Sequence, residues 1–273
     1  MRTRTRRAAA VATAAAALLG LAAPGAVADE RRLPDPAPGG PQRPYEPDVT
    51  GPRNIDTLSA TITPDGGTAH GGTAHGGTAH GVHVAFDRTS RAEPAGPPAA
   101  ARRFVFLFDA SLRFRPDAFP TCARTTIEQH GVHACPQGSR IGRGTSHTYP
   151  EGTAEVYAFN TRHPGGTRGA LVVVPAASTI LELTWERVTP HYQRAGYRWA
   201  LDEILPPTAT PPDQRVGTRR FELTWGATRR TGDGRPVSFA ETTARPGTEL
   251  GIGLWSEFVT GQTVLPETTA VRP

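Results

Sequence analysis

The chain has 273 residues and a formal net charge of +5, with 30 basic residues, all of them Arg, and 25 acidic residues. Four of these arginines lie in residues 1–28, where there is no acid, so the remainder has 26 basic against 25 acidic residues. Net basicity therefore gives no support to a nucleic-acid-binding role, and we expect none. The 30 Gly and 27 Pro exceed the usual share but stay short of a disordered composition.

Residues 1–28 have the pattern of a secretion signal. Arg2 to Arg7 form a basic start, Ala8 to Ala23 form a short apolar core, and Ala26-Val27-Ala28 fits a small-x-small cleavage site. The apolar run is too short to span a bilayer comfortably and lacks a stop-transfer flank, so we expect no transmembrane segment after signal removal. The pair Arg6-Arg7 leaves twin-arginine export open beside the general route. We predict a secreted, extracellular protein.

Residues 29–53 are rich in Pro and charge and predict a disordered leader. We place the folded domain at residues 54–265 and a C-terminal tail at residues 266–273. The domain begins at residues 55–63, where apolar residues alternate with Ser and Thr as in a half-buried strand. Pro64-Asp65-Gly66 then predicts a turn.

A perfect repeat follows, Gly-Gly-Thr-Ala-His three times, which places His70, His75 and His80 five residues apart, with His83 close behind. Neutral imidazole groups suit Zn, Cu or Ni. However, three identical units indicate a slipped duplication in a loop that tolerates insertion, and a Gly-rich loop offers no second shell to orient ligands. We therefore predict no metal site and no cofactor.

The segment Phe104-Val105-Phe106-Leu107-Phe108 is short, β-branched or aromatic, and uninterrupted by polar residues. This pattern is typical of a central strand that is buried on both faces. Leu112 and Phe114 continue it, and Arg115-Pro116-Asp117 ends it.

Both cysteines of the chain, Cys122 and Cys135, lie in the next stretch. In an exported protein two lone cysteines most simply form a disulfide. Residues 122–128 favour a short helix that ends at Gly131. The alternative is a metal site that adds His130 and His133, but that spacing matches no common zinc pattern.

Around these cysteines, residues 119–145 read Phe-Pro-x-Cys and, a dozen residues on, Ala-Cys-Pro-x-Gly-Ser-x-Ile-Gly-x-Gly. The pattern resembles that of a group of exported actinobacterial proteins of unknown function, P-x-C … CP-x-x-S-x-I/V-G-x-G. This resemblance implies a secreted β-rich domain with no assigned activity. Such relatives often carry a second cysteine pair near the C-terminus, whereas the region near Trp255 has none.

Six further short strands are predicted, separated by Gly- and Pro-rich turns: 155–159, 170–174, 180–185, 197–205, 219–225 and 237–240. Two of them repeat one pattern forty residues apart, since residues 181–185 read Leu-Glu-Leu-Thr-Trp and residues 221–225 read Phe-Glu-Leu-Thr-Trp. Trp185 and Trp225 are in phase with the apolar residues, so we expect both to point into the core.

Candidate ligand-binding residues are Tyr192, Tyr197 and Trp199, aromatic side chains that are suited to stacking on sugar rings if they are exposed. No nucleophile elbow, zinc-protease helix, phosphate loop or dinucleotide fingerprint occurs, so no catalytic residue is assigned. Acids such as Asp202, Glu203 and Glu151 can form a glycosidase pair only if the fold brings them together.

The run of short strands and turns predicts an all-β fold, a two-sheet, jelly-roll-like β-sandwich with at most one short helix in the disulfide loop. We expect a secreted, non-catalytic protein with a surface or interaction role. The alternatives are a carbohydrate- or cell-wall-binding module and a hydrolase of extracellular polymers. The expected partner is cell-wall polysaccharide or another exported protein.

Overall fold

The computed structural model describes residues 32–41, 44–65, 79–204, 210–215 and 217–273. Residues 32–273 belong to one compact unit. The predicted secretion signal at residues 1–28 and the repeat residues His70 and His75 lie outside the described residues. Among the described residues, no helix is long and apolar enough to cross a membrane.

Most of the described chain is β-structure, which confirms the predicted all-β class. The strands are β1 (Arg53–Pro64), β2 (His80–Glu93), β3 (Ala101–Asp109), β4 (Leu112–Phe114), β5 (Arg140–Thr148), β6 (Gly152–Arg162), β7 (Arg168–Val174), β8 (Thr179–Arg187), β9 (Tyr197–Ile204), β10 (Thr218–Trp225), β11 (Thr228–Arg230), β12 (Pro236–Ser238), β13 (Ala240–Thr242), β14 (Glu249–Phe258), β15 (Thr263–Val264) and β16 (Glu267–Val271). The helices are α1 (Arg124–His130) and α2 (Pro190–Arg194), beside short 3-10 turns such as η1 (Pro116–Ala118), η4 (Pro175–Ala177) and η5 (Pro212–Gln214).

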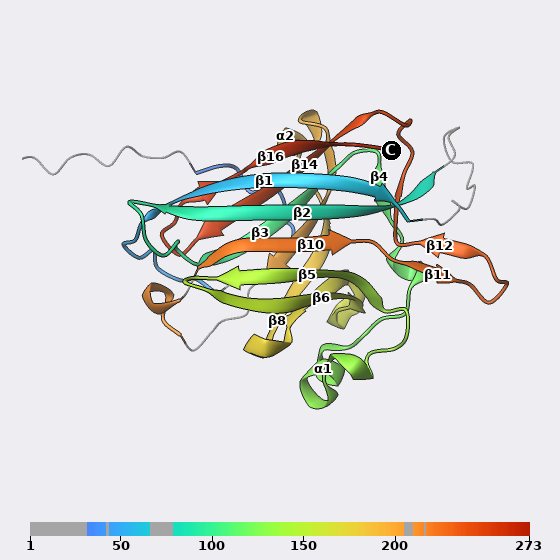
Figure 1. Ribbon diagram of the computed structural model, residues 1–273, viewed down its shortest axis with the longest axis horizontal. Coiled ribbons are helices and arrows are strands. Elements are labelled where there is room, and N and C mark those ends of the chain that lie inside the picture. Colours follow the sequence, from blue (N-terminus) through green and yellow to red (C-terminus); the bar gives the residue numbers. More distant parts are fainter. Residues whose placement is uncertain (1–31, 42–43, 66–78, 205–209, 216) are drawn as a thin grey trace, which may run out of the picture. The chain divides into compact units, whose positions relative to one another are not determined.

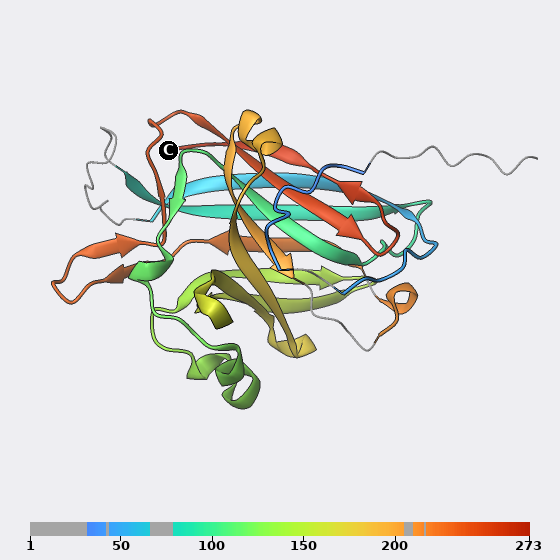
Figure 2. The same cartoon turned by 180° about the vertical axis from the view of Figure 1, so that it is seen from behind.

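In the described part of the chain, 14 strands form one continuous antiparallel sheet, in the order β15-β14-β3-β9-β8-β7-β6-β5-β10-β2-β13-β4, with β1 on β2 and β16 on β14. The sheet folds over, so that β1, β2, β10, β5 and β6 form one layer and β3, β14, β9 and β8 the other (Figures 1 and 2). The β-sandwich is confirmed, and its two layers are parts of one sheet. Strands β5 to β9 neighbour each other in chain order, whereas the pairs β14-β3, β3-β9, β5-β10 and β10-β2 join strands that are distant in the chain.

The core between the layers is aromatic. Phe86 on β2 meets Phe106 on β3 edge-to-face, with ring centroids 5.1 Å apart, although these strands are not hydrogen-bonded neighbours. Phe106 also contacts Trp225, with centroids 5.6 Å apart, and Trp225 is fully buried as its phase predicts. Strand β3 is buried on both faces, also as predicted, because its alternate residues Val105 and Leu107 belong to a second cluster on the outer side.

That second cluster covers the outer face of β3, β9 and β14. The segments on either side of the predicted domain also make contacts that the sequence did not indicate. The predicted leader is not free of contacts, because Ala37 is 1% exposed in this cluster and Leu33 packs against it. The predicted tail contains β16, whose Ala270 is buried in the core and which pairs with β14. Strand β3 has apolar side chains on both faces. Its outer face therefore offers an apolar surface on which Leu33 and Ala37 pack, although their own segment shows no periodic pattern.

A buried ion pair lies inside the sandwich near one end. The Arg88 Nε donates to Asp56 Oδ2 at 2.6 Å, and the two side chains are 2% and 0% exposed. The guanidinium lies over the rings of Phe104 and Phe258, 4.9 and 5.7 Å from their centroids. Burying an unpaired charge in such apolar surroundings is energetically costly, so removing either partner of the pair destabilises the fold.

Two glycines of β5 allow β10 to approach closely. A methyl group on Gly144 would overlap the backbone carbonyl oxygen of Glu222, and one on Gly142 would lie 2.6 Å from that of Thr224. Both obstacles are backbone atoms, which cannot rotate away as a side chain can. The Gly-x-Gly of the sequence pattern is thus required by strand packing.

We expect Gly144→Ala to lower the free energy of unfolding by about 1–3 kcal/mol, because the added methyl group must displace strand β10. Chemical denaturation measures this loss. Gly232→Ala is the control, since no atom lies within 4 Å of its added methyl group. Equal stability of the two variants would contradict the packing argument.

Candidate ligand-binding site

Two of the three aromatic residues predicted to bind ligand are buried. Tyr192 and Tyr197 are 2% and 4% exposed and lie in the outer cluster that covers β3. The Tyr192 hydroxyl donates to the carbonyl oxygen of Pro34 at 2.7 Å, and the Tyr197 hydroxyl donates to Glu267 Oε1 at 2.8 Å. Burial raises the pKa of Tyr192 to about 12, and burial with the Glu267 hydrogen bond raises the pKa of Tyr197 further. The predicted role of both tyrosines in stacking on a ligand is therefore wrong.

A register shift separates Trp199 from these tyrosines. Strand β9 slips against β3 between the pairs Phe108↔Trp199 and Asp109↔Tyr197. This irregularity adds a residue to β9, so Trp199 falls in phase with Leu201 on the inner face, whereas Tyr197 faces outward. A single bulge thus breaks the aromatic triplet that the sequence suggested.

Trp199 instead lines a cleft at one end of the sandwich. The cleft has a volume of about 320 Å³, and its walls are Phe114, Pro116, Arg168, Trp185 and Trp199. Trp185 and Trp199 come from the paired strands β8 and β9, in which Trp185 lies opposite Leu201 and Arg187 lies opposite Trp199. The two indoles are diagonal neighbours on one face, which is within reach for aromatic side chains.

The floor of this aromatic cleft is packed against the core. The Trp185 ring packs against Phe114 with centroids 4.3 Å apart, and Phe114 contacts Phe108 at 4.6 Å. Phe108 is fully buried, so the row of rings leads from the core to the cleft. Trp185 is half-buried at the edge of the core cluster, which agrees with its predicted inward phase and also leaves part of it to line the cleft.

Arginine side chains border the cleft. The Arg187 guanidinium lies over the Trp199 ring, 4.1 Å from its centroid, and so fixes the orientation of that indole. Arg168 pairs with Asp117, which also accepts a hydrogen bond from Arg162. The rim is therefore polar around an apolar floor, the composition typical of small-ligand sites.

The acids considered as a glycosidase pair are not brought together. Asp202 and Glu203 are consecutive on β9 and point to opposite faces. The Asp202 carboxylate accepts from Arg103 Nε and Nη2 at 2.7 and 2.6 Å on the outer side, whereas Glu203 lines a cavity between the layers. Glu151 lies in the exposed turn before β6.

A second acid, Glu186, approaches the Asp202–Arg103 pair on this outer side. Burial, with a smaller contribution from the Asp202 charge, raises the pKa of Glu186. A raised pKa in the folded state means that the charged form destabilises the fold, so stability falls as pH rises above the unfolded value of about 4.3.

We therefore expect Glu186→Gln to raise the free energy of unfolding at pH 7, with the gain vanishing below about pH 4, where Glu186 is protonated in both states. Urea titrations of the two proteins at pH 3.5, 5 and 7 measure it. A gain of the same size at every pH would show that the carboxylate charge is not its cause.

The cysteines form the predicted disulfide, Cys122–Cys135, with Cα atoms 5.2 Å apart. The rival metal site with His130 and His133 is therefore ruled out, and no cluster of metal-ligating side chains occurs in the described ranges. Helix α1 follows Cys122 and ends at Gly131, whose φ of 78° suits glycine.

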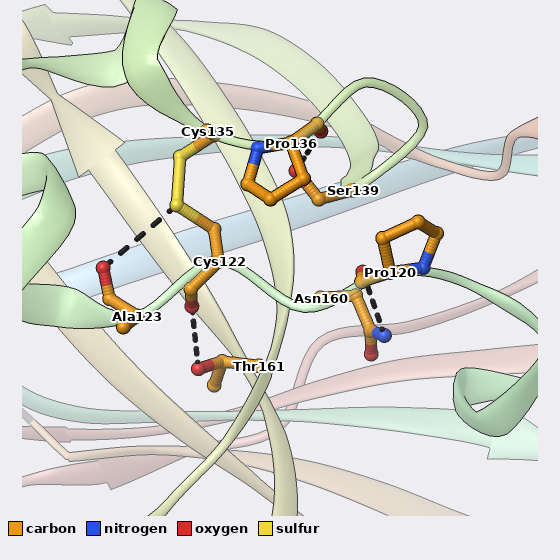
Figure 3. Close-up of a disulfide and its surroundings, with 8 residues drawn as sticks. All are labelled: Pro120, Cys122, Ala123, Cys135, Pro136, Ser139, Asn160 and Thr161. Carbon is orange, nitrogen blue, oxygen red and sulfur yellow. Dashed lines mark hydrogen bonds between the residues drawn. A yellow bond between two sulfur atoms is a disulfide. The ribbon is translucent and has the colours of Figure 1, made fainter.

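The segment 116–139, which contains helix α1 and both cysteines and is called the disulfide elbow below, is attached to the end of β6 (Figure 3). Asn160 Nδ2 donates to the carbonyl oxygens of Phe119 and Pro120, and the Thr161 hydroxyl donates to that of Cys122 at 2.8 Å. The same segment carries Pro116 to the aromatic cleft, so the elbow supports one wall of the candidate site.

Sequence reasoning missed Phe114, Pro116 and Arg168 as cleft residues. Phe114 and Pro116 come from the adjacent elements β4 and η1, whereas Arg168 starts β7, much later in the chain. The Pro in Arg115-Pro116-Asp117 predicted only the end of a strand. No local pattern indicates that this end meets β8 and β9.

No protein-family model matches the chain, and no curated protein shows significant sequence similarity to it.

Proposed function

We propose that this protein is an exported, non-catalytic binding module whose ligand site is the aromatic cleft of Trp185 and Trp199. The observation that carries the proposal is the pair of indoles that β8 and β9 place on one face, in a cleft of about 320 Å³. Export is supported by the pattern of residues 1–28, by the motif around the cysteines, and by the disulfide, which persists in oxidising compartments.

The chemistry of the cleft favours a saccharide. Apolar indole faces stack on the C–H faces of a sugar ring, and the rim arginines donate hydrogen bonds to its hydroxyl groups. Arg187 holds the Trp199 ring in a fixed orientation, which lowers the entropy lost when a ligand stacks on it. Cell-wall polysaccharide is the proposed partner, since an exported protein meets it outside the membrane.

A hydrolase is the less favoured function. Hydrolysis of a glycosidic bond needs two carboxyl groups that flank the bond. Asp202 and Glu203 face opposite sides of β9, and the aromatic cleft is lined by apolar and arginine side chains.

We expect Trp199→Ala to weaken binding to insoluble cell-wall polysaccharide by about 2 kcal/mol, about 30-fold in Kd, because it removes a stacking surface. A sedimentation assay with increasing polysaccharide measures the bound fraction. Tyr149→Ala is the matched control, since Tyr149 is 41% exposed and is not among the cleft residues. Equal retention of wild type and Trp199→Ala would refute the proposed site.

A further inference from the structure

A second and larger cavity lies at the opposite end of the sandwich from the aromatic cleft. Its volume is about 480 Å³, within the range of small-molecule sites. It opens where β3, β8 and β10 begin and where β5 and β9 end. The lining residues used below are Phe104, Thr179, Leu181, Glu203, Arg215 and Phe221.

The walls of this end cavity are mainly apolar. Phe104 and Phe221 are partly buried against the core cluster, and Leu181 belongs to it. Val174, Ala100 and Ala101 extend the same surface. A ligand that fills such a cavity is stabilised because its apolar surface is removed from water.

One carboxyl group lies within these walls. Glu203 is 1% exposed, and its position on β9, opposite Leu183 of β8, directs it between the layers. A buried carboxyl group in an apolar site accepts a hydrogen bond from a suitably placed donor. The hydroxyl groups of Ser146, Thr148 and Thr218 add further polar points on the lining.

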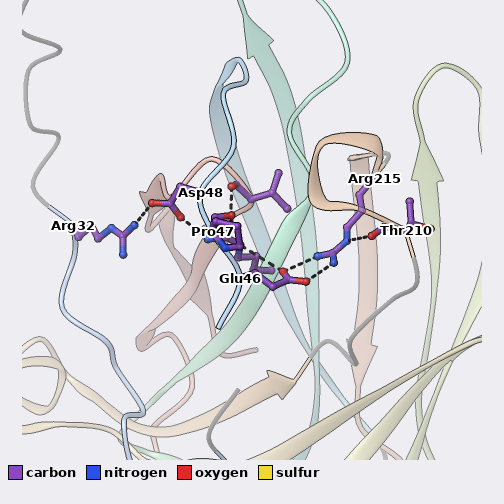
Figure 4. Close-up of polar contacts among 8 residues, drawn as sticks. Arg32, Glu46, Pro47, Asp48, Thr210 and Arg215 are labelled. Carbon is purple, nitrogen blue, oxygen red and sulfur yellow. Dashed lines mark hydrogen bonds and ion pairs between the residues drawn. The ribbon is translucent and has the colours of Figure 1, made fainter. Parts of the chain in front are cut away.

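The charge of the rim arginine is neutralised by the N-terminal segment (Figure 4). Arg215 Nη1 donates to Glu46 Oε2 at 2.9 Å, Nη2 donates to Glu46 Oε1, and Nε donates to the carbonyl oxygen of Thr210 at 3.1 Å. The Arg215 hydrogen bond lowers the pKa of Glu46, so the pair stays charged near neutral pH. With this arginine already paired bidentately, the rim offers no strong attraction for an anionic ligand.

We infer that the end cavity is a second ligand site, for an uncharged, mainly apolar small molecule that carries one hydrogen-bond donor directed at Glu203. The apolar walls select the body of the ligand. The pairing of Arg215 with Glu46 leaves an anionic head group without a counter-ion among the lining residues, and burying an unpaired charge is costly. The site is independent of the aromatic cleft, which lies at the other end of β8 and β9.

The test uses the mature protein and N-phenyl-1-naphthylamine, a neutral aromatic amine that fluoresces when it leaves water. We expect saturable binding of one molecule per chain. The anionic analogue 8-anilinonaphthalene-1-sulfonate should bind at least tenfold more weakly. Absence of saturable binding, or equal or tighter binding of the sulfonate, overturns the inference.

Two variants locate the probe. Thr179→Trp places an indole in the end cavity from the half-buried start of β8, and we expect it to weaken probe binding at least tenfold. Ala177→Trp does the same from the exposed turn η4, where a large side chain is tolerated more easily. Unchanged affinity in both variants overturns the inference, and near-ultraviolet circular dichroism identifies a variant that has not folded.

The cross-control separates this site from the proposed function. Trp199→Ala should leave probe affinity unchanged, and Thr179→Trp should leave polysaccharide retention unchanged. A tenfold loss of probe affinity in Trp199→Ala would place the probe in the aromatic cleft and overturn the second site.

Discussion

Replacing Asp56 with Ala is expected to lower the free energy of unfolding by about 3–5 kcal/mol, the largest effect that we predict for a single side chain. The variant leaves Arg88 charged and 2% exposed, with its guanidinium close to the rings of Phe104 and Phe258. Its remaining acceptor is the carbonyl oxygen of Thr218, 3.3 Å from Nη1. A buried charge without a counter-ion loses solvation that this one hydrogen bond does not replace.

The double variant Asp56→Ala/Arg88→Met is expected to recover most of this loss, because it removes the unpaired charge and keeps an apolar side chain of similar length. Guanidinium denaturation of both variants measures the difference. Asp87→Ala is the control, since Asp87 pairs with Arg220 at the surface, where water screens the charges, and should lower stability far less. A double variant no more stable than Asp56→Ala would contradict the buried-charge argument.

Removing the disulfide with Cys122→Ala/Cys135→Ala is expected to lower the free energy of unfolding by about 3 kcal/mol in the chain-entropy model, since the bond closes a loop between residues 13 apart. The loss should concentrate in the elbow, which has its own small cluster around Cys122 and Ile127. Trypsin cleavage after Arg124 should therefore become faster in the variant.

Reduction of the wild type with dithiothreitol is the matched comparison for this pair. It should reproduce both the lower stability and the faster cleavage, and it should leave the alanine variant unchanged. An alanine variant as stable and protease-resistant as the oxidised wild type would show that the hydrogen bonds from Asn160 and Thr161 are sufficient to hold the elbow.

The sequence predicted the elements that carry a clear local signal. The strand at residues 104–108 and the helix that ends at Gly131 depend on patterns within a few residues, and the disulfide follows from the presence of two cysteines in a chain with a secretion-signal pattern. The repeated Leu-Thr-Trp patterns are strands β8 and β10, with Trp225 in the core and Trp185 at its edge. The local sequence was sufficient to predict the positions of these tryptophans because burial in β8 and β10 alternates with the two-residue period of a strand.

The features that the sequence did not indicate lie in segments whose structure depends on contacts with distant parts of the chain. Asp35 pairs with Arg103, and Ala37 is buried by β3 and α2, yet residues 32–41 have no periodicity that would indicate a docking segment. Helix α2, which begins at Pro190, is five residues long and exceeds the one helix that we expected. Its Tyr192 is buried because it packs over the outer face of the sheet.

The candidate site also contains both kinds of residue, those that the sequence predicted and those whose position depends on distant contacts. Trp199 was predicted as a ligand residue and lines the aromatic cleft, whereas Tyr192 and Tyr197 do not. A bulge on β9 decides this difference, and no residue in Tyr197-Arg198-Trp199 marks it. Phe114 and Trp185 meet only because the sheet folds over, which a linear pattern does not indicate.

The most direct measurement of the central claim uses the four tryptophans of the chain as reporters. The indole N–H signals of ¹⁵N-labelled protein are assigned with Trp→Phe variants and followed as soluble cell-wall oligosaccharide is added. We predict saturable shifts for Trp185 and Trp199, with Trp225 and Trp255, which are 0% and 3% exposed, unaffected. No shift of Trp185 and Trp199 at saturating oligosaccharide, or shifts confined to Trp225 and Trp255, would contradict the account.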